Sequence, residues 1–216
     1  MNHEILFFSE DHLYLVDGQE VPSVTTILNY MSDAEYGKIP QATLDQAARR
    51  GSLVHEYTEE IDYGYDPDEV EYEVVPYIKA YYEFLRDYRP KWELVECPVY
   101  SKFFGYVGTL DRYGVIDGKK CVVDIKTVAS ATKMQKFITS AQTNAYAIAL
   151  KETDISKYTE KRCVLYLTKD GEYNFVDLSE YDRKYDFSSW GAFEKCLEMY
   201  RYVNGLKTAK AVKGNK

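Results

Sequence analysis

Residues 105–127 read GYVGTLDRYGVIDGKKCVVDIKT, with runs rich in Val, Ile and Tyr on either side of Asp117-Gly118. An Asp-Gly pair between such runs is a strong signal for a β-hairpin with a two-residue turn. With this turn, Ile116 faces Lys119, and each step away from the turn pairs the next residue of each strand. Asp111 is then expected directly opposite Asp124, and Lys126 two residues further along the face that carries Asp124.

The expected Asp111–Asp124 pair is unusual, because two carboxylates opposed across a ladder repel each other. A divalent cation removes the repulsion, since carboxylate oxygens on strands about 5 Å apart can converge on one hard ion. The pattern therefore predicts a metal site with Lys126 beside it. A lysine there can orient an attacking water or stabilise the anion that develops in phosphodiester hydrolysis. The alternative is a solvated hairpin face with Asp–Lys ion pairs.

Two residues outside the hairpin are further candidates for the predicted metal site. Glu96 lies early in the preceding predicted strand, from where it reaches the same site directly or through water; a surface carboxylate is the equal alternative. His55 lies in a predicted helix, and a neutral imidazole is an acceptable partner for a metal held mainly by carboxylates. Gly51, one turn before His55, leaves room for a backbone or a phosphate. A structural histidine is the other interpretation of His55.

Gln142 and Tyr146 are four residues apart on the clearest predicted helix, so they share a face. In that position they can contact the backbone of a nucleic acid or stack on a base. Ordinary helix positions are the alternative.

The pattern along the whole chain favours an α/β fold with a mixed sheet flanked by helices and an N-terminal β-hairpin. Predicted helices span 23–31, 41–61, 73–88, 131–151 and 188–203, and predicted strands lie within 4–21, 92–103, the central hairpin, 163–167 and 173–178. We expect a leading segment at 1–40 packed on the core, a main domain at 41–206 and a flexible lysine-containing tail at 207–216.

Composition places limits on function. The 216 residues are 45% hydrophobic and 29% charged, as in an ordinary globular protein. A net charge of −8 argues against nonspecific coating of nucleic acid, although a locally basic groove remains compatible with it. The four cysteines form no Cys-x-x-Cys pair, so free thiols in a reducing cytoplasm are expected. No apolar run reaches membrane-spanning length, and no membrane association is predicted.

Taken together, the motifs resemble the PD-(D/E)XK nuclease superfamily, in its RecB-like exonuclease branch. The matching elements, in order, are Gly51-x-x-x-His55, Gly108-x-x-Asp111, Asp124-x-Lys126-Thr127 and Gln142-x-x-x-Tyr146. They span about residues 51 to 146, and their order is more specific than any one of them. The segment Pro22–Leu28 is also similar to the leading segment of phage-encoded members and of the mitochondrial genome maintenance exonuclease.

The resemblance implies a restriction-endonuclease-like core and a metal-dependent DNA exonuclease that acts on free, single-stranded ends in recombination, repair or replication. It implies Mg²⁺ or Mn²⁺ held by His55, Asp111, Asp124 and the Ile125 carbonyl, catalysis by Lys126, and DNA contacts from Gln142, Tyr146, Ser23 and Thr25. Capping a helix is the simpler role for Ser23.

Other expectations complete this prediction. The iron–sulfur cluster of CRISPR-associated relatives is not expected, because Cys163 and Cys196 are far apart in the sequence. A recombinase, a helicase or a single-strand-binding protein is an expected partner. The alternatives are a structure-specific or flap endonuclease of the same fold and a catalytically inactive DNA-binding module.

Overall fold

The structure, a computed structural model, describes residues 3–8, 13–67, 69–129 and 132–214, with side chains described as far as residue 205. The elements, in chain order, are β1 (Ile5–Phe8), β2 (Leu13–Val16), β3 (Gln19–Val21), α1 (Val24–Tyr36), α2 (Gln41–Asp62), α3 (Val75–Tyr88), β4 (Lys91–Ser101), β5 (Tyr106–Ile116), β6 (Lys119–Val128), α4 (Lys133–Thr153), β7 (Lys161–Thr168), β8 (Tyr173–Asp177), α5 (Leu178–Tyr185) and α6 (Ser189–Gly214).

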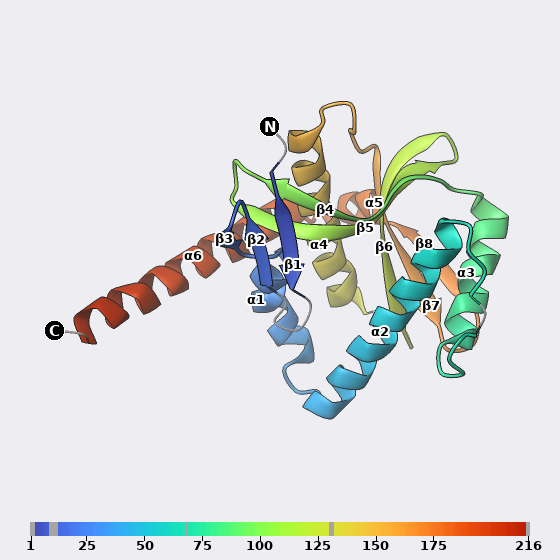
Figure 1. Cartoon of the computed structure of the whole chain (residues 1–216), viewed down its shortest axis with the longest axis horizontal. Coiled ribbons are helices and arrows are strands. Elements are labelled where there is room, and N and C mark those ends of the chain that lie inside the picture. The colour runs from blue at the N-terminus through green and yellow to red at the C-terminus, as the bar shows by residue number, and fades with distance from the viewer. Residues whose placement is uncertain (1–2, 9–12, 68, 130–131, 215–216) are drawn as a thin grey trace.

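A five-stranded sheet in the order β4-β5-β6-β7-β8 forms the centre of the molecule (Figure 1). Strands β6 and β7 are parallel, with α4 as the crossover between them, and the other neighbouring pairs are antiparallel. The predicted mixed sheet is therefore confirmed. The N-terminal strands form a separate antiparallel sheet in the order β1-β2-β3, with Asp17-Gly18 at its second turn.

Helices cover both faces of the central sheet. On one face, α1, α4 and α6 pack against the strands through a cluster that includes Ile27, Leu28, Leu110, Tyr113, Val122, Ala145, Leu150 and Phe193. On the other face, α2 and α3 pack through a cluster that includes Val54, Tyr81, Phe84, Ile116, Val123, Ile125 and Leu165. In Figure 1, α2 and α3 lie toward the right and α1 and α4 toward the left. This α–β–α arrangement confirms the predicted fold class.

The β5–β6 hairpin has the predicted turn and, near the turn, the predicted register. Asp117 and Gly118 both have positive φ, at 50° and 73°, as a two-residue hairpin loop requires. Pairing runs from Ile116–Lys119 to Arg112–Val123. Beyond this last pair the strands separate, because β5 continues only along β4 and β6 only along β7. We call the point beyond Arg112–Val123 the fork.

The fork corrects one prediction. Asp111 and Asp124 were expected to face each other across the ladder, but they are the first residues beyond its last pair. The polar side chains of this region therefore lie in an opening between two strands rather than on the face of a continuous sheet.

The helix boundaries also differ from the prediction. Helix α1 continues to Tyr36, beyond the expected Met31, and ends where the Gly37 N–H donates to the Asp33 carbonyl. Helix α5 was not predicted; it has only eight residues, too few for a periodic pattern to distinguish a helix from a loop. Helix α6 runs to Gly214 rather than ending near Val203.

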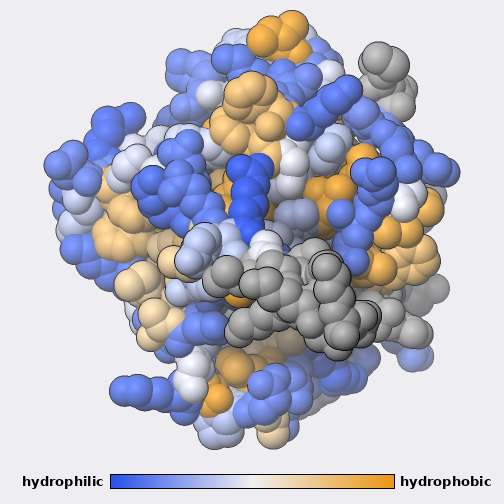
Figure 2. Space-filling model, turned by 90° about the vertical axis from the view of Figure 1, so that its left-hand side faces the viewer, coloured by the Kyte–Doolittle hydropathy of each residue, from blue (hydrophilic) through white to orange (hydrophobic). Residues whose placement is uncertain are grey.

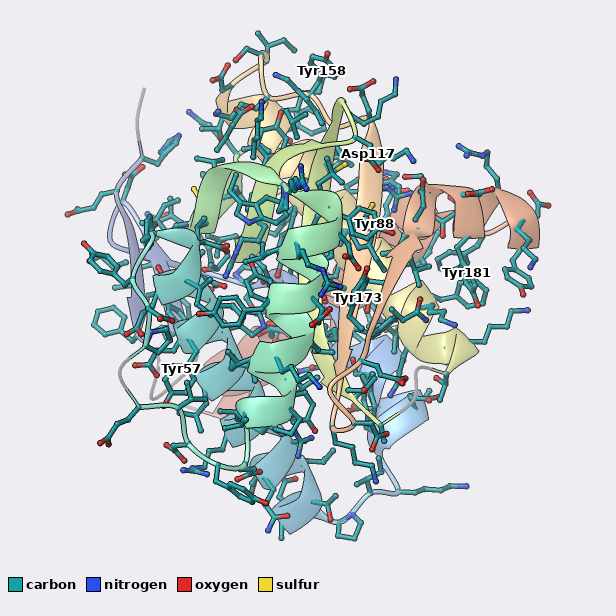
Figure 3. All side chains as sticks on the ribbon, turned by 90° about the vertical axis from the view of Figure 1, so that its right-hand side faces the viewer. Tyr57, Tyr88, Asp117, Tyr158, Tyr173 and Tyr181 are labelled. Atoms are coloured by element: carbon teal, nitrogen blue, oxygen red, sulfur yellow. The ribbon has the colours of Figure 1, made fainter. Side chains whose placement is uncertain are left out.

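The tyrosine-rich composition is explained in part by an aromatic cluster at the edge of the sheet. The ring of Phe84 lies 5.2 Å from Tyr88, 5.8 Å from Tyr173 and 5.2 Å from Phe175. Figure 3 shows Tyr88 and Tyr173 close together beside α3, with other labelled tyrosines spread over the surface. Tyrosine suits such edges because its ring is apolar and its hydroxyl reaches solvent or a polar partner.

The surface is mixed in character. On the face shown in Figure 2, hydrophobic residues form separate patches among hydrophilic ones. Among the residues that the structure describes, no helix is long and apolar enough to cross a membrane.

Candidate active site

A cleft of about 800 Å³ opens at the fork. It is bounded by β5 and β6, by α2, by α4 and by the N-terminal sheet. Its walls include Ser23, Thr25, His55, Glu96, Asp111, Ile125, Lys126, Gln142 and Tyr146. The fold thus brings together side chains that the sequence separates by more than one hundred residues. Asp124 is the predicted site residue that does not line the cleft, and it is buried directly behind the wall.

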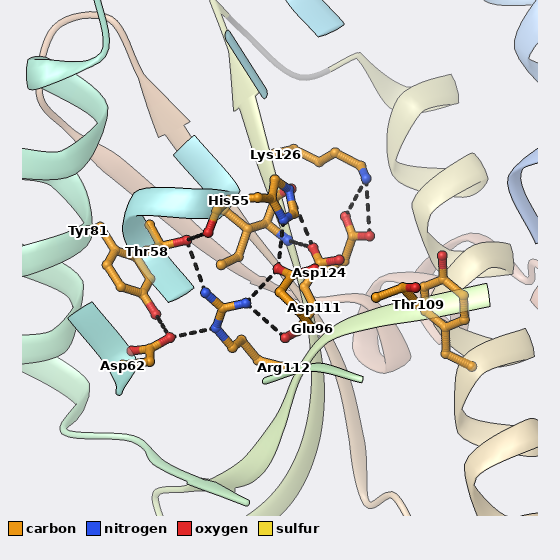
Figure 4. Close-up of polar contacts among 12 residues, drawn as sticks. His55, Thr58, Asp62, Tyr81, Glu96, Thr109, Asp111, Arg112, Asp124 and Lys126 are labelled. Carbon is orange, nitrogen blue, oxygen red and sulfur yellow. Dashed lines mark hydrogen bonds and ion pairs between the residues drawn. The ribbon is translucent and has the colours of Figure 1, made fainter. Parts of the chain in front are cut away.

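His55, Glu96 and Asp111 converge, with one ligand atom of each within 4.8 Å of the others. His55 Nδ1 lies 2.9 Å from a carboxylate oxygen of Glu96, and His55 Nε2 lies 3.1 Å from the Ile125 carbonyl oxygen (Figure 4). Two carboxylates, a carbonyl and one imidazole form a donor set that suits a hard divalent ion such as Mg²⁺ or Mn²⁺. The residues present therefore fit the metal that the motifs imply, with Glu96 added to the expected set.

Asp111 occupies the fork itself. Its Oδ2 accepts a hydrogen bond of 2.6 Å from the Ile125 backbone N–H, so the carboxylate takes the place of a strand carbonyl where the ladder has ended. Burial raises the pKa of Asp111 to about 7, and the nearby carboxylates of Asp124 and Glu96 act in the same direction against the positive charges of His55 and Lys126. A carboxyl group with so high a pKa gains from a cation nearby.

His55, next to the Asp111 carboxyl group, carries a positive charge. Burial acts to lower the pKa of its ring, but the Asp111 carboxylate and the hydrogen bond to Glu96 outweigh burial and raise the pKa to about 9. Both ring nitrogens face oxygen acceptors. Without a metal ion the imidazole is therefore protonated at neutral pH, and the proton neutralises part of the charge that a cation would neutralise.

Asp124 pairs with Lys126 rather than with Asp111. Lys126 Nζ lies 3.1 Å from Asp124 Oδ1 and 2.9 Å from Oδ2. Only 1% of the Asp124 surface is exposed, and within the part of the chain that the structure describes Oδ2 has no aligned hydrogen-bond donor. Burial acts to lower the pKa of Lys126, but Asp124 and Asp111 outweigh it and raise the pKa, so the amine stays charged. Asp124 as a metal ligand remains a prediction, and its observed contact is with Lys126.

Arg112 is a site residue that the sequence analysis missed. Its side chain is fully buried. Its donors reach Asp62 Oδ2 at 2.5 Å, Glu96 Oε1 at 2.7 Å and Thr58 Oγ1 at 3.0 Å. Asp62 is held in turn by hydrogen bonds from the Tyr81 hydroxyl and the Trp92 indole. The available signal was an arginine directly after Asp111 in a strand of mostly apolar residues, because a buried charge requires partners.

Glu96 connects this buried network to the cleft. Its carboxylate accepts from Arg112 and contacts His55, and these positive neighbours outweigh burial and lower its pKa. Its φ is +42°, a left-handed conformation that is rare for a residue other than glycine. Leu94 and Cys97 on either side contact the same core cluster although they are three residues apart, so the alternation of β4 is broken at Glu96. Backbone strain of this kind is often found at functional sites.

Gln142, Tyr146 and Gly108 form the wall on the α4 side. The Tyr146 hydroxyl accepts a hydrogen bond of 3.1 Å from the Gln142 amide. A Cβ at Gly108 would lie 2.7 Å from the Tyr146 ring, so only glycine leaves room for this tyrosine. Burial, with Asp111 and Asp124 nearby, raises the Tyr146 pKa well above 10. The predicted DNA contacts of Gln142 and Tyr146 stay predictions, although both line the cleft.

Ser23 has the simpler of its two predicted roles. It is the N-cap of α1, and its Oγ accepts a hydrogen bond of 3.0 Å from the Thr26 N–H. The same hydroxyl lies 2.9 Å from Thr25 Oγ1, and both residues line the cleft. Gly51 of α2 also lines the cleft, and nothing lies closer than 4.0 Å to the position of a Cβ there. DNA contacts by Ser23 and Thr25 remain predictions.

Comparisons with known proteins add little to this picture. A scan against protein-family models finds no match, and a search of curated proteins finds none either. A solved structure titled "Crystal structure of SSO0001" is similar with a TM-score of 0.37 and 15% identity, covering 83% of this chain and 75% of that chain. A TM-score of this size is too low to establish a shared fold. Membership of the PD-(D/E)XK superfamily therefore remains a prediction from motifs.

Proposed function

We propose that this chain is a cytoplasmic, metal-dependent DNA exonuclease of the PD-(D/E)XK type, which hydrolyses phosphodiester bonds from free single-stranded ends. The observation that supports this proposal best is the convergence of His55, Glu96 and Asp111 with the Lys126 amine on the wall of the same cleft. Lone carboxylate clusters are common on protein surfaces. A cluster at the end of a broken ladder, with a charged lysine beside it, matches the needs of phosphate hydrolysis.

Each residue has a role in this proposal. His55, Asp111, Glu96 and the Ile125 carbonyl would hold Mg²⁺ or Mn²⁺. Such an ion would supply a lowered pKa for a water molecule and neutralisation of phosphate charge. The Lys126 ammonium, held by Asp124, donates a hydrogen bond to the attacking water or to a phosphate oxygen. Arg112 holds Glu96, which holds His55 Nδ1, so the imidazole keeps Nε2 turned toward the Ile125 carbonyl and Asp111.

The charge of the cleft makes DNA binding itself depend on the metal. Glu56, Glu59, Glu96 and Asp111 line the cleft together with Lys126. Burial, with Glu96 nearby, raises the pKa of Glu59, as expected where carboxylates are crowded. A polyanionic strand is repelled by such a wall until a divalent ion compensates the charge. We therefore expect weak DNA binding in EDTA and tighter binding with Ca²⁺, which supports binding without requiring hydrolysis.

The test is digestion of end-labelled linear single-stranded DNA in Mg²⁺ or Mn²⁺ by the wild type and by Lys126→Ala. We expect Lys126→Ala to lower kcat by about a hundredfold or more, the scale for loss of one transition-state donor. Lys119→Ala is the matched control, because Lys119 forms an ion pair with Glu160 at the exposed hairpin tip. It is expected to leave the rate unchanged. A wild type that digests no DNA with either metal overturns the proposal and favours the inactive binding module.

Covalently closed single-stranded circles separate the enzyme alternatives. An exonuclease leaves them intact while it digests the linear form. Cleavage of the circle by the wild type, but not by Lys126→Ala, would assign an endonuclease instead.

A further inference from the structure

An aromatic pair stands at the mouth of the cleft, on the N-terminal sheet. Phe7 and Tyr14 are direct cross-strand partners in β1 and β2. Their rings stack with centroids 4.4 Å apart and planes inclined by 28°. Both residues line the cleft, yet their exposure differs: 6% of the Tyr14 surface and 43% of the Phe7 surface are exposed. An apolar ring is thus presented on the wall of a cleft that is otherwise rich in carboxylates.

This pair is attached firmly to the candidate active site. The Tyr14 hydroxyl lies 2.9 Å from Thr109 Oγ1, two residues before Asp111 on β5. The Val107 N–H donates to the Pro22 carbonyl, and Ser23 bridges to Val107. Tyr14, Val16 and Val107 share a small buried core with Ile5. The position of Phe7 relative to Asp111 is therefore set by packing and hydrogen bonds rather than by a loose loop.

We propose that Phe7, backed by Tyr14, is a stacking surface for an unpaired nucleobase of the DNA strand bound in the cleft. This inference rests on the proposed nuclease function and assigns the contact by which the cleft selects single-stranded DNA. Every base has an apolar π-face, so stacking on an aromatic side chain tolerates any sequence. In a duplex both faces of an internal base are already stacked on neighbours. An aromatic ring at the cleft mouth therefore selects for strand state and not for sequence.

A second feature supports base stacking over purely electrostatic capture. The cleft wall carries several carboxylates, so the surface offers little attraction to phosphates away from the metal site. Contacts to the bases avoid this repulsion, because the bases are uncharged. The proposal predicts that affinity depends on the presence of bases and only moderately on salt.

The experiment compares Phe7→Leu, Phe7→Trp and the control Phe8→Leu. Phe8 is the next residue on the same strand, is similarly exposed at 47%, and does not line the cleft. For digestion of single-stranded DNA, we expect Phe7→Leu to raise KM about tenfold with kcat within about twofold, on the scale of one lost base stack. Phe7→Trp restores KM, and Phe8→Leu leaves it unchanged. Equal KM values for Phe7→Leu and the wild type overturn the proposal.

Abasic oligonucleotides provide the decisive readout. Binding is measured by fluorescence anisotropy in Ca²⁺ with normal and abasic strands of equal length. Loss of the bases should weaken the wild type about tenfold and Phe7→Leu hardly at all, because both changes remove the same contact. A merely structural role of Phe7 would weaken binding of both strands equally, and that result overturns the proposal.

The binding assay also separates this inference from the proposed function. If the wild type binds normal strands better than abasic ones through Phe7 but digests neither, the stacking surface stands and the nuclease proposal fails. If it digests DNA but Phe7→Leu discriminates against abasic strands as the wild type does, the nuclease proposal stands and the stacking surface fails. If the wild type binds no DNA at all, both fail.

Discussion

The β5–β6 hairpin has two halves that follow different rules. Between the turn and Arg112–Val123 the strands pair in regular register, and their apolar side chains alternate between the two core clusters. Beyond the fork the same strands no longer pair, and they carry Asp111, Asp124 and Lys126. The comparison shows that the end of a β-ladder can create a site. Beyond the last pair, the backbone N–H and C=O groups and the space between the strands become available to polar side chains.

The two halves of the hairpin also differ in how completely their charged side chains are paired. In the paired half, the charged side chain that is fully buried is Arg112, and it is surrounded by acceptors. In the open half, Asp111 has a pKa raised to about 7, mainly by burial, and His55 beside it has one raised to about 9. The paired half is thus electrostatically complete, whereas the open half gains further stability from a bound cation.

Arg112→Met should have the largest effect on stability. It removes the arginine partner of the buried Asp62 carboxylate and of the partly buried Glu96 carboxylate, and breaking a buried ion pair typically costs about 3–5 kcal/mol. The measurement is urea unfolding at pH 7. Arg86→Met is the control, because Arg86 forms ion pairs on the exposed face of α3, and such pairs contribute little. Equal stabilities of the two variants would refute the buried network.

The next largest expected effect is the change with pH in the stability of the metal-free protein. A pKa raised in the folded state means that protonated His55 stabilises the fold below about pH 6.5, and that this stability is lost as pH rises to about 9. The loss is at most about 3 kcal/mol. The raised pKa of Asp111 acts in the same direction between its usual value of 3.8 and about 7. Melting temperatures in EDTA should therefore fall from pH 6.5 to 9, and His55→Gln should flatten this decline.

Adding Mn²⁺ sharpens the same test. Metal ions compete with protons for these ligands, so stabilisation by Mn²⁺ should be larger at pH 9 than at pH 6.5. A stabilisation independent of pH would place the ion elsewhere.

Gly108→Ala and Gly51→Ala compare the effect of an added methyl group at a crowded and at an open position of the cleft wall. A Cβ at Gly108 would meet the Tyr146 ring at 2.7 Å, so we expect about 2 kcal/mol of destabilisation from overpacking and a loss of nuclease activity. Gly51 lies inside α2 with nothing closer than 4.0 Å, so alanine should stabilise the helix by up to about 1 kcal/mol. Chemical denaturation of both variants is the measurement, and similar changes in both would contradict the close contact at Gly108.

Gly118→Ala should have the smallest effect. Among the described residues, no atom lies within 4 Å of its added Cβ, but the φ of +73° is unfavourable for alanine by about 1 kcal/mol. DNA digestion should be unchanged, because the turn lies at the far end of the paired half. A loss of activity without a loss of stability would show that the two halves are coupled.

The sequence predicted the paired half well and the open half in part. The turn and the register near it follow from local chemistry, namely an Asp-Gly pair between β-forming runs. The mixed sheet follows from the order of predicted helices and strands along the chain. The end of the ladder at Arg112–Val123 does not follow from it, because extrapolated pairing has no local stop signal. The left-handed backbone of Glu96 was equally hidden, since glutamate rarely adopts it. The position of His55 beside Asp111 agreed with the motif order, whereas Arg112 required the three-dimensional arrangement.

The regular half of the hairpin also constrains how the chain can change in length. Side chains alternate between faces along a strand, so deleting one residue from either arm between the turn and the fork would send every side chain beyond it to the opposite face. Removing two residues from each arm would keep both the pairing and the faces and would draw the loop toward the site. Added residues at the loop itself would leave the carboxylates and the lysine where they are. Related chains should therefore vary in length at the tip and keep the two arms matched.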